Sequence, residues 1–265
     1  MLATAMTSVA SCSPKGDQSE FQKRSEPFQM FYDTKYKIGG RYQRLQRDPG
    51  RLIETPLRPS LMRARIPSSY LAFISHPWGG WAKQVWDHAN FGFNVDTLAP
   101  APITDLIGDK GGRTVEISLG GSSESFRWLA KRPTIDGARI VSSSPEEVVW
   151  KYGSDQKYTL YSHDLVELDG TPIIISCSNL CRARLTITPD LAGLPVKDPR
   201  DGYGPEGIAL EVSFDAQSLS QWRDIRVKAL CFAAASIVGF NRNEAFQHGP
   251  TCMAVQNAIA ATLRK

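Results

Sequence analysis

The sequence predicts an α+β fold: an antiparallel sheet, built as a meander, with a C-terminal amphipathic helix packed on it. Short runs with strand character follow one another between Gly, Pro, Asp and Ser turn signals. These runs are residues 91–98, 113–119, 138–142, 148–152, 157–162, 172–177 and 181–188. No helical pattern alternates with them, which argues against a parallel doubly wound sheet.

The last predicted strand leads directly into the helix. Apolar residues alternate with small or polar ones over residues 207–214, as in a half-buried strand. The period then becomes helical, and one apolar stripe contains Trp222, Ile225, Ala229, Phe232 and Ala233. Ser218 and Gln221 have the spacing of a capping box, so we expect them to begin this helix.

Residues near both ends of the domain complete the expected fold. A short strand over residues 62–71 is broken by Pro67, since proline cannot donate to a strand ladder. A second short helix begins near Pro250, a favoured first-turn residue, and ends in Arg264 and Lys265. We therefore expect a single folded domain over residues 61–265.

Composition and charge set broad limits on function. The chain has 265 residues, of which 42% are hydrophobic, and this suffices for a sizeable core. The net charge of +4 is compatible with solubility, an acidic partner or an anionic membrane surface, and does not by itself imply nucleic acid. No apolar run approaches the ~20 residues of a membrane-spanning helix, so we expect no part of the mature chain to cross a bilayer.

Residues 1–12 have the character of a lipoprotein signal remnant. An uncharged run of small and apolar residues ends in Val9-Ala10-Ser11-Cys12. This motif resembles the bacterial lipobox, and the resemblance implies that Cys12 is acylated as the first residue of the mature protein. Because no Lys or Arg precedes the short run, we expect the chain to start at a downstream Met of a longer precursor. The alternative is a frayed N-terminus with an incidental cysteine.

Four further cysteines form the even number expected of a disulfide framework in an oxidising compartment: Cys177, Cys181, Cys231 and Cys252. Three pairings are open. A Cys177–Cys181 bridge requires a tight turn, because a continuous strand holds their Cα atoms ~13 Å apart. Asn179 tolerates the left-handed conformation that such a turn uses. A Cys231–Cys252 bridge would tie the helix to the C-terminal segment, and a zinc site is the alternative use of all four.

Residues 13–60 have the composition of a flexible basic arm. Nine cations and two anions lie between residues 35 and 65, interleaved with aromatic residues. We expect Arg41, Arg44 and Arg47 to contact a protein partner or an anionic membrane, and expect no nucleic acid. The alternative is a solvated arm that docks on its own domain.

A loop rich in Trp and Gly is the second predicted binding surface. It contains Trp78, Trp81 and Trp86, and tryptophan supplies a large contact area at low entropic cost. His76 and His88 flank this loop, but the close ligand pairs typical of zinc are missing. We therefore predict neither a metal site nor a cofactor.

No catalytic motif is clear in the sequence. Residues 120–124 follow a predicted strand but do not match G-x-S-x-G. His163 and Asp164 end another strand and are the residue types that complete a catalytic triad. We predict no catalytic residue, with a periplasmic hydrolase that uses His163 or His88 as the alternative.

Three patches carry a family resemblance: residues 65–71, the cysteines at 177 and 181, and Leu219-x-x-Trp222-x-x-Ile225. Together they resemble poorly characterised lipoproteins of Gram-negative bacteria, some regarded as immunity proteins against type VI secretion effectors. The resemblance spans residues 62–232 and carries over no functional residue. It implies a membrane-tethered binder that blocks a toxin by occupying its surface. Ser13 follows Cys12 where an Asp would retain a lipoprotein in the inner membrane, which implies outer-membrane sorting.

These observations together predict a periplasmic protein, anchored to the outer membrane by lipid, that binds and occludes a partner protein such as a toxic effector. Besides the hydrolase, the remaining alternative is a structural envelope lipoprotein without a toxin partner.

Overall fold

The computed structural model describes residues 52–57, 62–75, 88–101, 113–120, 126–131, 137–153, 157–167, 170–187, 208–237 and 249–264. Strands β1 (Leu52–Leu57) and β2 (Met62–Pro67) form a two-stranded antiparallel sheet. Nine further strands form one antiparallel sheet, which confirms the predicted fold class. They are β3 (Leu71–Ser75), β4 (His88–Asn94), β5 (Thr114–Gly120), β6 (Ala138–Ser143), β7 (Glu147–Tyr152), β8 (Lys157–Val166), β9 (Pro172–Cys177), β10 (Leu180–Ile187) and β11 (Ile208–Asp215).

The nine-stranded sheet consists of two meanders that meet in its interior. Its strand order is β3-β4-β5-β11-β10-β9-β8-β7-β6. The chain builds β3, β4 and β5 side by side, passes to β6 at the opposite edge, and returns strand by strand until β11 pairs with β5. In register, Leu210, Val212 and Phe214 of β11 lie opposite Leu119, Ile117 and Val115 of β5. The last strand therefore joins the two halves of the sheet.

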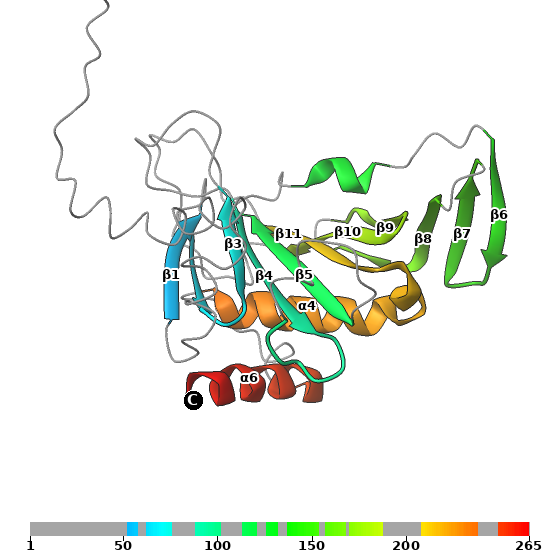
Figure 1. Cartoon of the computed structure of the whole chain (residues 1–265). Helices are drawn as coiled ribbons and strands as arrows, with labels where there is room; N and C mark the ends of the chain where they lie inside the picture. The colour runs from blue at the N-terminus through cyan, green and yellow to red at the C-terminus, as the bar shows by residue number, and fades with distance from the viewer. Residues whose placement is uncertain are drawn as a thin grey trace, which may run out of the picture.

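Two stacked helices lie on one face of this sheet. Helix α4 (Trp222–Ser236) crosses the face, and α6 (Pro250–Leu263) packs on the side of α4 that points away from the sheet (Figure 1). The predicted apolar stripe of α4 is buried along its length. Two short 3-10 helices complete the described elements: η1 (Arg127–Ala130), which contacts β9 and β10, and η4 (Ala216–Gln221), which joins β11 to α4.

An aromatic cluster lies where α4 meets the first meander. The Phe232 ring stacks on Phe93 with centroids 4.2 Å apart, and it contacts Tyr70 at 5.4 Å. All three side chains are fully buried. The Tyr70 hydroxyl donates to the carbonyl of Leu98 at 2.9 Å, so the cluster buries its polar atom with a partner. Burial of each such side chain contributes about 1.5–3 kcal/mol.

Two predicted boundaries need correction. Residues 52–57 fall in the predicted arm but form β1. The strand predicted over residues 91–98 begins at His88 and ends at Asn94, because the Asn94 carboxamide oxygen accepts from the backbone N–H groups of Asp96 and Thr97 and turns the chain. Leu98 completes this turn with a φ of 60°.

The predicted capping box does not form either. Asp215 caps the chain three residues earlier, where its carboxylate accepts from the Gln217 N–H at 2.7 Å and begins η4. Ser218 is buried, and the Gln221 side chain accepts instead from Arg113 at 2.9 Å. Among the described residues, no helix is both long enough and apolar enough to span a membrane.

Candidate functional site

Most predicted binding residues lie outside the described part of the chain. This applies to Cys12 and to the whole predicted surface of Arg41, Arg44, Arg47, Trp78, Trp81 and Trp86. His88 is the first residue of β4, and its side chain lies outside the described part of the structure. Those assignments stay predictions.

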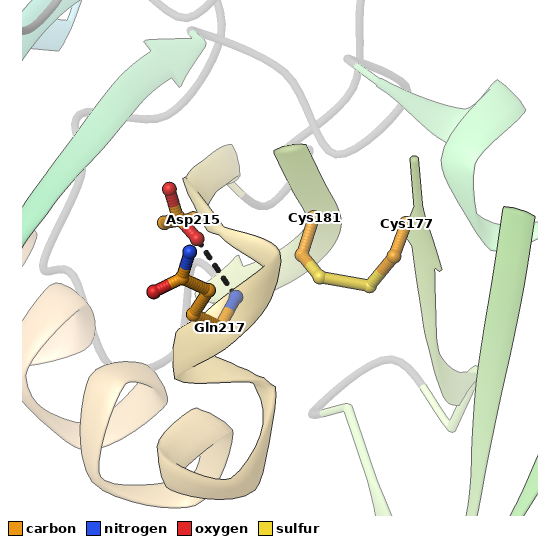
Figure 2. The surroundings of a disulfide bond; sticks show 4 residues. All are labelled: Cys177, Cys181, Asp215 and Gln217. Atoms are coloured by element: carbon orange, nitrogen blue, oxygen red, sulfur yellow. Dashed lines mark hydrogen bonds between the residues drawn. A yellow bond between two sulfur atoms is a disulfide. The ribbon is translucent and has the colours of Figure 1, made fainter. Parts of the chain in front are cut away.

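A disulfide joins Cys177 and Cys181 across the β9–β10 hairpin (Figure 2). The two residues are partners in the strand register, with Cα atoms 3.9 Å apart, so the chain turns within three residues. Asn179 does not take the left-handed conformation that we expected, since Leu98 and Phe126 are the only described non-glycine residues with positive φ. The Asn179 carbonyl instead accepts from the Ala216 N–H, which ties this hairpin to the start of η4.

The second disulfide joins Cys231 of α4 to Cys252 of α6. Both cysteines are buried, and the bridge spans 21 residues of sequence. Because all four cysteines are bonded in pairs, the zinc alternative is wrong. Two intact bridges are typical of proteins that fold in an oxidising compartment.

His163 does not form a catalytic triad in the described part of the chain. Its backbone N–H donates to the Glu146 carbonyl, and its exposed ring lies 5.5 Å from the ring of Tyr161. The neighbouring Asp164 carboxylate is engaged elsewhere, in a bidentate ion pair with Arg223 at 2.8 and 2.9 Å. A triad needs the acid to orient the imidazole, and here the acid orients a guanidinium.

The Asp164–Arg223 pair belongs to a polar cluster that fixes the start of α4 on the sheet. Arg223 lies over the ring of Trp222 at 4.6 Å, and the indole Nε1 donates to the Glu147 carboxylate at 2.9 Å. Hydrogen bonds from Arg223 lower the pKa of Asp164 to about 2. Ser162 donates to the same carboxylate at 2.9 Å. These contacts join α4 to β7 and β8, which is a structural role.

Two half-buried carboxyl groups lie on the sheet face opposite α4. The Glu116 carboxylate accepts from Asn90 at 3.1 Å, and Asn90 in turn accepts from Ser118 at 2.9 Å. Burial raises the pKa of Glu116 and also that of Glu211, whose carboxylate lies 3.5 Å from the Arg182 guanidinium. The described residues contain no group of three His, Cys, Asp or Glu that could hold a metal ion.

A fully buried carboxyl group, Glu167, completes the sheet where β9 and β10 separate. Pairing between these strands ends at Ala183, which leaves the Thr186 N–H without a partner strand. The Glu167 carboxylate accepts from that N–H at 2.7 Å and lies 3.5 Å from Arg226 of α4. Burial raises the pKa of Glu167 despite the charge of Arg226. Its role is therefore to satisfy the backbone inside the fold.

The distal hairpin, formed by β6 and β7 (residues 138–152), buries few of its side chains. It stands at the end of the sheet away from α6 (Figure 1). Every side chain from Arg139 to Ser143 is exposed, and Val148 is the one buried residue of β7. Ile140 and Val141 are 53% and 46% exposed, which is unusual for two β-branched residues in a strand.

The distal hairpin was predicted as two strands but not as a site. Residues 138–142 and 148–152 carry the local signal of strands, whereas their position at a sheet edge depends on which strands pair over long distances. The sequence signal that could have identified the edge is the composition of β6, where Arg and Ser surround two β-branched residues. The exposed edge and apolar residues make this hairpin the candidate interaction surface.

Comparison of the chain with models of protein families, with curated proteins and with solved structures found no match.

Proposed function

We propose that this protein is a periplasmic binding protein that neutralises a secreted effector by covering part of its surface, and that lipid on Cys12 holds it at the outer membrane. The observation that carries the proposal is the distal hairpin, whose apolar side chains Ile140 and Val141 are exposed at a sheet edge. Such an edge is a common docking surface between proteins.

Two further features support this proposal. The disulfides at Cys177–Cys181 and Cys231–Cys252 fit folding outside the cytosol. The sequence resemblance to Gram-negative lipoproteins adds the membrane anchor and the effector as the type of partner. The polar clusters around Asp164, Glu116 and Glu167 connect elements of the fold and leave surface recognition as the activity that the described residues support best.

Location is tested by the intact mass of the chain from a Gram-negative envelope fraction, with and without reduction before thiol alkylation. We expect a diacyl or triacyl adduct at Cys12. We expect the other four cysteines to react with the alkylating reagent only when the protein has first been reduced. An unacylated, fully reduced chain in the cytosol would contradict the proposal.

Neutralisation is tested with the product of the neighbouring gene, exported to the periplasm of a host with and without the full chain. We expect growth arrest that the exported chain relieves and a complex that survives gel filtration. Replacing Trp78 and Trp81 by alanine tests the predicted loop, with Trp128→Ala as the matched control because Trp128 is 57% exposed on η1. The proposed function would be contradicted if the exported chain did not relieve the growth arrest and formed no complex. The loop would be excluded as a binding surface if the double variant bound as tightly as the wild-type chain.

A further inference from the structure

No described strand pairs with the outer edge of β6. Within the described part of the sheet, β6 pairs with β7 alone. Its side chains are exposed on both faces, so no described element covers the edge. An extended segment can pair with such an edge because the backbone N–H and C=O groups that point away from β7 supply the hydrogen bonds.

The charges at this edge are unbalanced. Arg139 of β6 lies directly opposite Lys151 of β7 in the register, and like charges in that position destabilise a strand pair. No described acidic side chain forms an ion pair with either cation, and the Lys151 ammonium lies 5.5 Å from the ring of Tyr158. Other described cations do have carboxylate partners: Arg113, Arg182, Arg223, Arg226 and Lys228. A negatively charged side chain from a partner would therefore balance these two cations, which no described residue does.

The opposite face of the same edge is apolar. Ile140 lies opposite Trp150, and side chains alternate between faces, so these two residues lie on the other face from Arg139 and Lys151. An apolar residue placed opposite Ile140 on an added strand would shield its exposed side chain from water. The edge therefore favours a strand with an acidic residue opposite Arg139 and an adjacent apolar residue opposite Ile140.

The charges at this edge argue against a second copy of the chain as the occupant. If two β6 strands paired antiparallel about Ile140 and Val141, each Arg139 would lie opposite Ser142, which offers no carboxylate. Self-pairing leaves both cations unbalanced.

We infer that the β6 edge binds an extended segment of the partner protein as an added antiparallel strand, with an acidic residue opposite Arg139 and an apolar residue opposite Ile140. This inference rests on the proposed function, because it names the surface through which the partner is bound. The affinity arises from backbone hydrogen bonds, and the acidic residue sets the selectivity.

The test uses two synthetic peptides with blocked ends and the full-length, disulfide-bonded protein labelled with nitrogen-15. The first peptide is Thr-Ser-Val-Val-Glu-Thr, which aligns Glu with Arg139 and Val with Ile140. The second carries Lys in place of Glu. We expect the Glu peptide to shift the amide signals of β6 and to bind about fivefold more tightly than the Lys peptide, the difference that one cross-strand charge pair supports.

Variants separate selectivity from simple net charge. Arg139→Glu should reverse the preference between the peptides, whereas Arg264→Glu, the same charge change at the exposed end of α6, should leave it unchanged. Near-ultraviolet circular dichroism and the urea midpoint show whether each variant is folded. Equal affinity for both peptides, signal shifts outside β6, or dimerisation of the protein through this edge would overturn the inference.

The same variant distinguishes the two proposals in the neutralisation assay. If Arg139→Glu still neutralises the effector fully, the β6 inference is wrong and the proposed function stands. If the wild-type chain neutralises no effector but selects the acidic peptide, the proposed function is wrong and the selectivity of the edge stands.

Discussion

Loss of the α4–α6 disulfide should destabilise this protein more than loss of the hairpin disulfide. The perturbation is Cys231→Ala together with Cys252→Ala. The bridge closes 21 residues of sequence, and loop closure of that length restricts the unfolded chain by about 3 kcal/mol. Helix α6 buries few side chains, namely Cys252, Val255 and Thr262, so the bridge is a major part of what holds it on α4.

The matched control is Cys177→Ala together with Cys181→Ala. This bridge closes a separation of only 4 residues, for which the same relation gives about 2 kcal/mol. The hairpin also keeps its strand pairing and the hydrogen bond from the Ala216 N–H to Asn179 without the bridge. We therefore expect the α4–α6 variant to lose about 1.5 kcal/mol more than the hairpin variant.

Urea unfolding of the three oxidised proteins, followed by tryptophan fluorescence, measures these free energies. A loss of about 3 kcal/mol is a large part of the 5–15 kcal/mol that stabilises a typical domain, so the midpoint should move clearly. An equal or larger loss in the hairpin variant would refute the loop-length argument for this fold.

Three further predictions concern the core and two titrating groups. Phe232→Ala should cost about 3–5 kcal/mol in unfolding free energy, because it empties the centre of the aromatic cluster, whereas Val227→Ala on the exposed face of α4 should change it by about 0.5 kcal/mol or less, as urea melts would show. Burial raises the pKa of Glu116, so its contribution to stability is present below its ordinary value of 4.5 and is lost as the pH rises through the folded value. Glu116→Gln should therefore gain stability relative to wild type as the pH rises above 4.5, and parallel curves of unfolding free energy against pH would contradict this. Hydrogen bonding to Arg223 lowers the pKa of Asp164 to about 2, so the cost of Asp164→Asn should be present above pH 3.8 and vanish as the pH falls through 2 in the same series of melts.

Local patterns predicted much of this fold. The alternation in β11 and the apolar stripe of α4 reflect which side chains face the core. The local sequence pattern was therefore enough to predict a strand and then a helix over residues 208–236. The Cys231–Cys252 bridge was one of the three pairings left open by the even number of cysteines, and the structure contains it. Pro67 and Pro250 mark a strand end and a helix start, as their geometry requires.

The rest depends on contacts between distant residues. Gln221 was expected to cap a helix, but Arg113 from β5 takes its side chain. Glu116 gave no sign of burial, because the strands that enclose it come from two different meanders. The distal hairpin became a candidate site only through the strand order, which places Ile140 and Arg139 at an open edge.

The meeting of two meanders at β5 and β11 has a consequence for how fast the protein folds. Most strand pairs in the sheet join neighbours in sequence, so their loops close quickly. The β5–β11 pair joins residues more than a third of the chain apart. Closing this long loop has an entropic cost, and the contacts of the pair offset that cost only after both meanders have formed. We expect this seam to form late. In pulse-labelled hydrogen exchange, the amides of β5 that bond to β11 should gain protection after those shared by β7 and β8.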